Sequence, residues 1–308
     1  MPPLLMRFRL ALGFAALITI AVPALAANSA KVIILGSGTP IPDPSRSGPC
    51  VAIVSNGQAY LFDAGSGVVR QAQAAAQKFG IAGLDATHLT RLFITHLHSD
   101  HTLGYPDLIL TPWVVGRRQP LEVYGPKGIA AMTSHLKQAY AADIQIRTGG
   151  LEGLNDAGLA VNVHEIEGGG VVYKDANVTV RSIVVKHGSW PQAFGYAIDA
   201  GGRRIVISGD TQPTQAVVDA CHGCDVLVHE VYSEDRFNLV FGTSRGQYHR
   251  SFHTSTTELA ELASKAKPKL LVLYHQLYFG VPEEVDLVKE IHRTYSGDVV
   301  NGSDLTEY

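Results

Sequence analysis

Apolar residues recur along this chain in short runs, and these runs alternate with segments of helical periodicity. Short runs rich in Val, Ile, Leu, Phe and Tyr predict β-strands. Two of the runs contain a tight-turn signal, Asn56-Gly57 and Gly201-Gly202, and should fold as hairpins. We expect strands within 31–39, 51–65, 91–98, 121–126, 178–188, 194–210, 225–232 and 270–276.

The segments between these runs have the composition of helices. Ser255 and Glu258 stand three residues apart at the start of one such segment, which is the pattern of a capping box. The expected helices cover 67–80, 128–143, 255–266 and 282–295. No Ser/Pro-rich linker or low-complexity tract divides the chain. Two β-rich halves with helices between their strands indicate one α/β domain of stacked sheets with helices outside.

The first 26 residues have the three-part plan of a secretory signal peptide. A basic start with Arg7 and Arg9 precedes an apolar stretch at 10–22, and Ala24-Leu25-Ala26 follows as a small-residue cleavage site. An uncleaved membrane anchor is the alternative, but the apolar stretch is short for a span. We expect cleavage after Ala26, which leaves a domain of residues 27–308 that is periplasmic or secreted and has no attachment to the membrane.

Charge and cysteine content limit the partners and the cysteine chemistry that the protein can have. The chain has 25 Lys and Arg, two of them in the leader, against 28 Asp and Glu. Such a mildly acidic surface gives no electrostatic attraction to nucleic acid or to an anionic membrane. Of the three cysteines, Cys221 and Cys224 should form a local disulfide in an exported protein, and Cys50 stands alone. A thioredoxin-like role would need this pair at a helix start, whereas it follows the helical segment 214–220.

Residues 93–105, FITHLHSDHTLGY, concentrate histidine and aspartate directly after an apolar run. On an extended segment, His96 and His98 point the same way and can bind one ion together. Asp100 and His101 lie just beyond and can face a second ion. Imidazole and carboxylate ligands suit Zn²⁺, with Mn²⁺ or Fe possible.

Further donors follow at the ends of later apolar runs. His187, Asp210 and His275 each stand at such a position. A single histidine at a strand end is usually a hydrogen-bonded structural residue. Repeated strand-end clusters in one chain favour a metal centre instead.

The motif THLHSDH resembles the HxHxDH signature of the metallo-β-lactamase superfamily. The segments LGSGTP, FDAG, PLEVYGPKG, HGSWPQAFGYAI, SGDT, VHE and FHTST resemble the ribonuclease Z-like branch, which also contains metal-dependent arylsulfatases and phosphodiesterases. The resemblance covers nearly all of the mature chain. It implies a four-layer αββα sandwich with two zinc ions at one edge.

Carried over by motif, the resemblance assigns a role to each donor. His96, His98 and His187 would bind the first ion, Asp100, His101 and His275 the second, and Asp210 would bridge both. The catalytic residues would be Asp100, at the metal centre, and His253, which would assist the leaving group.

The motifs leave other roles open. Asp63 would either orient a ligand histidine or satisfy a turn. His229 should be structural or support a ligand. Trp113, Arg117 and Arg118 would either line the substrate mouth or pack against the domain.

Three departures argue against tRNA processing. Only about a dozen residues separate Gly195-Tyr196 from Gly209-Asp210, where ribonuclease Z carries its tRNA-binding arm. Gln276-Leu277-Tyr278 replaces a Ser-x-Arg motif, and export would separate the enzyme from its RNA.

We therefore expect an exported dinuclear zinc hydrolase of small esters, foremost an arylsulfatase, without a nucleic-acid partner. A phosphodiesterase of the same branch or a lactonase is the alternative, and a non-enzymatic metal-binding module is a third class. Asp210 argues against a true β-lactamase, which lacks that bridge. The oligomeric state is open, a homodimer included.

Overall fold

The structure is a computed structural model that describes residues 29–241 and 246–308. The expected leader 1–26 lies outside these residues. None of the helices within the described ranges is long and apolar enough to cross a membrane.

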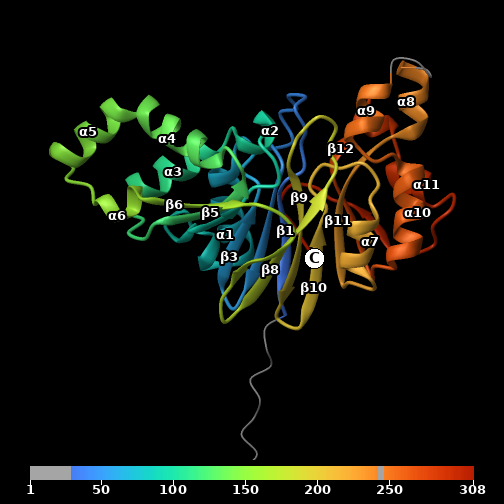
Figure 1. Ribbon diagram of the computed structural model, residues 1–308, viewed down its shortest axis with the longest axis horizontal. Coiled ribbons are helices and arrows are strands. Elements are labelled where there is room, and N and C mark those ends of the chain that lie inside the picture. The colour runs from blue at the N-terminus through green and yellow to red at the C-terminus, as the bar shows by residue number, and fades with distance from the viewer. Residues whose placement is uncertain (1–28, 242–245) are drawn as a thin grey trace, which may run out of the picture.

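Two seven-stranded mixed sheets form the centre of the molecule (Figure 1). In spatial order, the first sheet contains β14 (Thr306–Glu307), β1 (Lys31–Gly36), β2 (Cys50–Ser55), β3 (Gln58–Phe62), β4 (Arg91–Phe93), β5 (Leu121–Pro126) and β6 (Val161–Ile166). The second contains β13 (Val299–Asn301), β12 (Leu271–Leu277), β11 (Val226–Tyr232), β10 (Arg203–Ile207), β9 (Ala193–Ala200), β8 (Val178–Val185) and β7 (Gly170–Lys174).

Helices flank both sheets. Those of the N-terminal half are α1 (Val68–Phe79), α2 (Ser99–Thr102), α3 (Tyr105–Val114), α4 (Ile129–Ala139), α5 (Ala141–Gly149) and α6 (Asp156–Leu159). Those of the C-terminal half are α7 (Gln215–Cys221), α8 (Glu234–Phe241), α9 (Gln247–Phe252), α10 (Thr256–Ala266) and α11 (Leu287–Ile291). The described ranges also contain three short 3-10 helices, η1 (Ala82–Leu84), η2 (Ala86–His88) and η3 (Pro282–Glu284).

The alternation of side chains along each strand builds the layers. On β1, Val32 and Ile34 face the core between the two sheets, whereas Ile33 and Leu35 face the core under α1 and α3. A third core lies between the second sheet and α7, α10 and α11. The layers run helix, sheet, sheet, helix, and the predicted αββα sandwich is confirmed.

Several local predictions are also confirmed. Asn56-Gly57 and Gly201-Gly202 form two-residue hairpin turns with left-handed backbone at all four residues. The capping box of α10 forms as expected. Because β9 and β10 are joined by that second turn alone, no arm is inserted between them.

Other segments differ from the prediction. The expected strand 91–98 ends at Phe93. The Asp63 carboxylate accepts a hydrogen bond from the Thr95 N–H at 2.8 Å, and this takes the backbone out of the sheet ladder. The expected helix 128–143 divides at Tyr140 into α4 and α5, which project from the molecule together with α6 (Figure 1).

Trp113 and Arg117 pack inside the domain. Both side chains are fully buried, and the Arg117 guanidinium donates to the backbone carbonyls of Leu89, Leu108, Ile109 and Gly158. They do not line the substrate mouth, so the packing alternative holds for these two residues.

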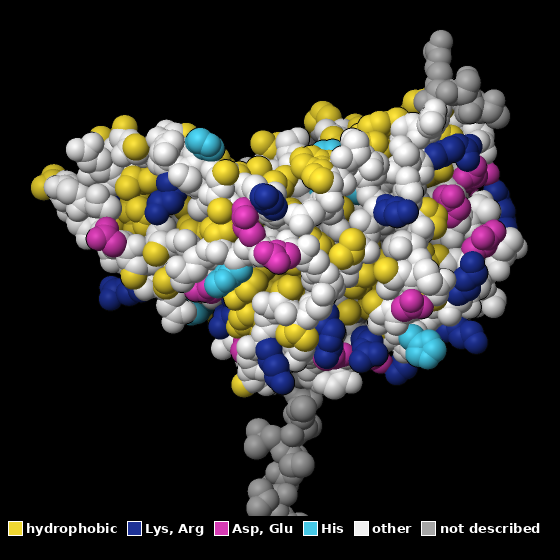
Figure 2. Space-filling view, viewed as in Figure 1, with side chains coloured by type: hydrophobic (Ala, Val, Ile, Leu, Met, Phe, Trp, Pro, Cys, Tyr) yellow, Lys and Arg dark blue, Asp and Glu magenta, His cyan; other side chains and the backbone are white. Residues whose placement is uncertain are grey.

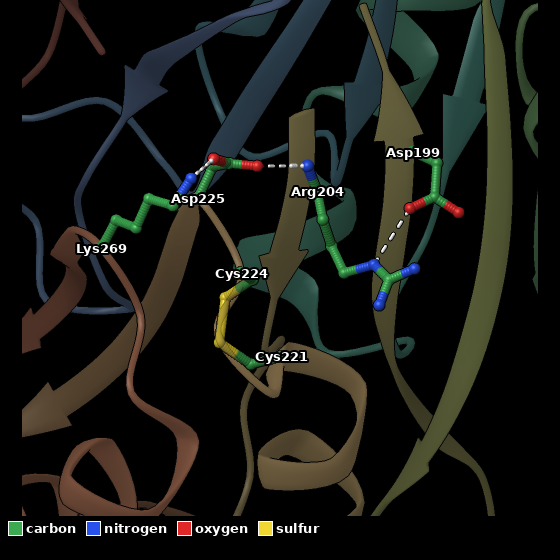
Figure 3. Close-up of a disulfide and its surroundings, with 6 residues drawn as sticks. All are labelled: Asp199, Arg204, Cys221, Cys224, Asp225 and Lys269. Atoms are coloured by element: carbon green, nitrogen blue, oxygen red, sulfur yellow. Dashed lines mark hydrogen bonds and ion pairs between the residues drawn. A yellow bond between two sulfur atoms is a disulfide. The ribbon is translucent and has the colours of Figure 1, made fainter. Parts of the chain in front are cut away.

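The disulfide Cys221–Cys224 is present at the end of α7 (Figure 3). His222 and Gly223 between the cysteines have left-handed backbone, which turns the chain tightly toward β11. The Asp225 carboxylate beside it accepts from Lys269 Nζ at 2.7 Å and from a backbone N–H at 2.7 Å.

Candidate metal centre

Seven potential metal ligands meet at one edge of the sheets, near α2 at the top of Figure 1. They come from five separate segments that the two sheets bring together. The segments are the chain after β4 with His96 and His98, α2 with Asp100 and His101, the chain after β8 with His187, the chain after β10 with Asp210, and β12 with His275.

Three histidines form the first cluster. His98 Nδ1 lies 2.9 Å from His96 Nε2 and 3.0 Å from His187 Nε2. Each ring therefore turns one nitrogen toward a common point. This is the first-ion set that the resemblance implies.

Asp100, His101, Asp210 and His275 form the second cluster. Asp100 Oδ2 lies 3.1 Å from His275 Nε2 and 3.5 Å from His101 Nε2. Asp210 Oδ2 lies 3.3 Å from His101 Nε2 and 3.4 Å from His275 Nε2. Asp210 also lies close enough to His96 to share an ion with it, so its carboxylate stands between the clusters.

His275 reaches this cluster through a β-bulge. Glu230 pairs with Tyr274 and Val231 with Gln276, which leaves His275 as the extra residue of β12. Its φ of 45° is left-handed, a conformation that non-glycine residues rarely adopt. A bulge of this kind redirects a side chain, and here it turns His275 toward Asp100.

Hydrogen bonds behind the ligands fix their orientation. Asp63 Oδ2 lies 2.8 Å from His101 Nδ1, and the same carboxylate holds the Thr95 N–H and hydroxyl. His187 Nδ1 lies 2.7 Å from the Phe252 carbonyl oxygen. Such contacts leave Nε2 of each ring available for a cation. The two roles considered for Asp63 thus occur together.

The electrostatics separate the two clusters. Burial lowers the pKa of His96 well below its ordinary value and that of His187 to about 4, so these rings are neutral donors. Burial also opposes charge on His101, but Asp210 and Asp63 outweigh it and raise its pKa well above the ordinary value. Burial likewise opposes ionisation of Asp210, yet His275 and His101 hold its pKa well below the usual range.

Buried polar atoms without a hydrogen-bond partner show that the donor set suits a cation. Within the described part of the chain, His101 Nε2, Asp210 Oδ1 and His275 Nδ1 are such atoms. A buried polar atom without a partner is costly unless a ligand satisfies it. Neutral imidazoles and carboxylates are typical ligands of zinc and related ions, so the clusters could hold metal ions.

His253 lies beside the second cluster. Its Nδ1 is 3.9 Å from Asp210 Oδ2 and 3.3 Å from Glu230 Oε2. Burial lowers the pKa of His253 to about 4, and burial together with Asp210 raises that of Glu230 well above its ordinary value. His229 faces away, with its Nδ1 2.7 Å from the Glu230 carbonyl oxygen, in accord with a structural role.

Sequence reasoning did not assign Glu230, although the motif VHE contains it. Its carboxylate accepts the Thr254 N–H at 2.8 Å and so fixes the segment that carries His253. The signal that could have identified Glu230 is its charge: it stands inside a fully buried strand, and a buried carboxyl group requires a partner.

An open pocket of about 450 Å³ adjoins the centre, lined by Asp100, Leu103 and loop 39–46 among others. A larger cavity of about 600 Å³ lies near the disulfide, and none of the seven ligands lines it. A substrate could therefore reach the candidate metal centre through the first of these two pockets.

The αββα layers and this edge of histidines and aspartates define a metallo-β-lactamase-fold hydrolase. The chain belongs to this superfamily: the family model described as "Beta-lactamase superfamily domain" matches residues 58–276. Its relatives place it in the ribonuclease Z-like branch. It is 32% identical over 279 residues to Ribonuclease Z of Mycobacterium marinum, covering 89% of this chain and 96% of that protein.

Other comparisons agree. Ribonuclease Z of Mycobacterium sp. (strain KMS) is 33% identical over 278 residues, with 89% of this chain and 94% of that protein covered. The fold is similar to YhfI from Bacillus subtilis (TM-score 0.68, 19% identity, 91% and 100% covered). It is also similar to the short form of human tRNase Z (TM-score 0.65, 23% identity, 90% and 98% covered).

These comparisons overturn two expectations. The arylsulfatase assignment is wrong, and so is the expectation of a small ester substrate without a nucleic-acid partner, because the relatives matched over nearly their whole length are named Ribonuclease Z. The missing arm and the acidic net charge bear on how a substrate is held. They do not determine which bond the centre hydrolyses.

Proposed function

We propose that this protein is a metal-dependent phosphodiesterase of the ribonuclease Z-like branch and that it cleaves phosphodiester bonds in RNA. The observation that carries the proposal is the complete seven-ligand set in a chain that matches ribonucleases Z over at least 94% of their length. A binding module without turnover would not need all seven ligands.

The proposal gives each part of the centre a task. His96, His98 and His187 would hold one zinc ion, and Asp100, His101 and His275 a second, with Asp210 between them. When bound, the two ions would supply Lewis acidity for attack by water on phosphorus.

His253 would donate a ring proton to the departing ribose oxygen and recover one from Glu230, whose carboxyl lies 3.3 Å from His253 Nδ1 and whose pKa burial raises well above its ordinary value. An alkoxide is a poor leaving group, and such assistance contributes about 10²- to 10⁴-fold. The contacts of Glu230 with His253 and Thr254 support this role, because they hold the ring near Asp210.

The test uses residues 27–308 loaded with zinc and a 5′-labelled RNA hairpin with a single-stranded 3′ extension. We expect cleavage by the parent protein and by Asp107→Ala, a control at a half-buried residue in the first turn of α3 that is not among the seven ligands. Asp210→Ala should lose about a hundredfold or more, because the ligand between the clusters is gone. Zinc-loaded protein that hydrolyses nitrophenyl sulfate but neither RNA nor a nitrophenyl phosphodiester would refute the proposal.

We also propose that the leader 1–26 is removed and that the protein works outside the cytoplasm. The Cys221–Cys224 disulfide supports this, because disulfides persist in oxidising compartments. N-terminal sequencing of periplasmic and culture fractions should find Ala27 as the first residue. An intact Met1 in the cytoplasmic fraction alone would contradict export.

A further inference from the structure

A column of aromatic rings leads from a metal ligand to the surface. The His98 and Phe252 rings are nearly parallel, with an interplanar angle of 20° and centroids 6.2 Å apart. Tyr248 stacks on Phe252 at 4.3 Å and 27°. Phe252 is buried, whereas Tyr248 is 53% exposed, so the column ends in an accessible ring.

Trp190 adds a second aromatic wall beside the same ligand. Its ring meets His98 edge to face at 5.0 Å, and its indole N–H points to His98 Nε2 at 2.7 Å. Trp190 lies in the turn after His187, and Tyr248 lies on α9. Two segments distant in sequence thus surround the outer side of the first cluster with rings.

Tyr248 is unusual in its exposure. Among the Phe, Tyr and Trp residues that the structure describes, only Tyr140 and Tyr248 have exposed side chains. Tyr140 stands between α4 and α5 on the helical projection, whereas Tyr248 stands on α9 at the metal edge (Figure 1). Hydrophobic side chains gather along this upper edge in Figure 2. Burial raises the pKa of the Tyr248 phenol, and the charges of Asp100 and Asp210 add to the rise.

Resting on the proposed function, we propose that Tyr248, supported by Phe252, is the subsite that stacks a nucleobase next to the scissile phosphate, with Trp190 beside the same ligand, His98. Every base has a planar face that can stack on an aromatic ring, and such stacking is tolerant of sequence. The subsite would hold one base close to the ions without the inserted arm. Binding of a base at such a ring is worth about 5- to 150-fold in affinity.

The test compares AMP with ribose 5-phosphate, which has the same phosphate and sugar but no base. Binding to the zinc-loaded protein is measured by calorimetry. Tyr248→Leu should weaken AMP binding about 5- to 150-fold and leave ribose 5-phosphate unchanged. Tyr248→Phe should bind AMP like the parent, because the ring is kept. Tyr140→Leu is the matched control and should change neither ligand.

Tryptophan fluorescence gives a second readout. The chain contains only Trp113 and Trp190, and Trp113 is fully buried. AMP should change the emission of the parent protein, and Trp190→Phe should abolish that change.

An equal loss of both ligands in Tyr248→Leu, or no loss of AMP, would overturn the subsite. RNA cleavage with unchanged AMP affinity in Tyr248→Leu would refute the subsite alone. AMP binding that depends on Tyr248 in a protein that cleaves no phosphodiester would refute the proposed function alone.

Discussion

Replacing Asp63 with asparagine should weaken both metal binding and the stability of the fold, because this carboxylate serves both. Its Oδ1 accepts the Thr95 N–H at 2.8 Å. Its Oδ2 accepts the Thr95 hydroxyl at 2.9 Å and lies 2.8 Å from His101 Nδ1. Asparagine can keep the first bond, but its amide nitrogen would then face two groups that need an acceptor.

The magnitude follows from these contacts. Facing an amide donor, His101 either loses its partner or reverses its tautomer, which puts the hydrogen on the nitrogen that faces Asp210. Loss of such a supporting contact lowers metal affinity about 10- to 100-fold. The free energy of unfolding of the metal-free protein should fall by about 1–3 kcal/mol for the unsatisfied buried groups. Asp63→Ala loses every acceptor and should cost more.

The assay is zinc titration against a competing chelator, with urea unfolding of the metal-free variants alongside. Asp85→Asn is the matched control, because Asp85 also accepts a backbone N–H and a hydroxyl, both from Thr87, but lies at η2. We expect parental zinc affinity in the control and weaker binding of the second zinc ion in Asp63→Asn. Two ions bound by Asp63→Asn with parental affinity would refute the orienting role.

Three further predictions follow from the same geometry. Since the pKa values of His101 and His275 are raised, the metal-free protein keeps protons there that zinc must displace. As the pH falls from about 8 to 6, the affinity for the second ion should therefore fall about tenfold or more per pH unit, whereas the affinity for the first ion stays nearly constant. Zinc titrations in which both affinities depend equally on pH would contradict this. His253→Ala should slow RNA cleavage about 10²- to 10⁴-fold but bis(p-nitrophenyl) phosphate far less, since nitrophenolate needs no proton; equal losses in kcat would exclude proton transfer. Asp175 accepts hydrogen bonds from the hydroxyls of Tyr60 at 2.7 Å and Tyr173 at 2.8 Å, and these bonds join the two sheets. Asp175→Ala should therefore reduce the free energy of unfolding by about 2–4 kcal/mol in urea titrations. A change within about 0.5 kcal/mol would show that these bonds are not stabilising.

The clustering of the candidate metal ligands was predictable because they stand near strand ends, where sheet topology gathers them. His96, His98 and His187 required only the apolar runs before them and the family motif. The layers were predictable for a similar reason, since alternation along β1 and its neighbours gives each sheet two apolar faces.

Other features depend on contacts that no local pattern encodes. The bulge that turns His275 inward arises from its register against Glu230 and Val231 on β11. β4 ends at Phe93, two residues before Thr95, whose N–H is held by Asp63, 32 residues distant in sequence. The exposure of Tyr248 became visible only when α9 was placed beside the metal edge. The substrate was misjudged because the absence of an arm says nothing about the bond that is cleaved.

The most direct measurement titrates zinc into metal-free protein and follows bound zinc and bis(p-nitrophenyl) phosphate hydrolysis in the same samples. The proposed centre predicts two ions per chain, little hydrolysis at one, and a rate that reaches its plateau as the second site fills. Asp210→Ala should not show that second rise. Full phosphodiesterase activity at less than one bound ion per chain, or no activity with both sites filled, would contradict a two-ion phosphodiesterase.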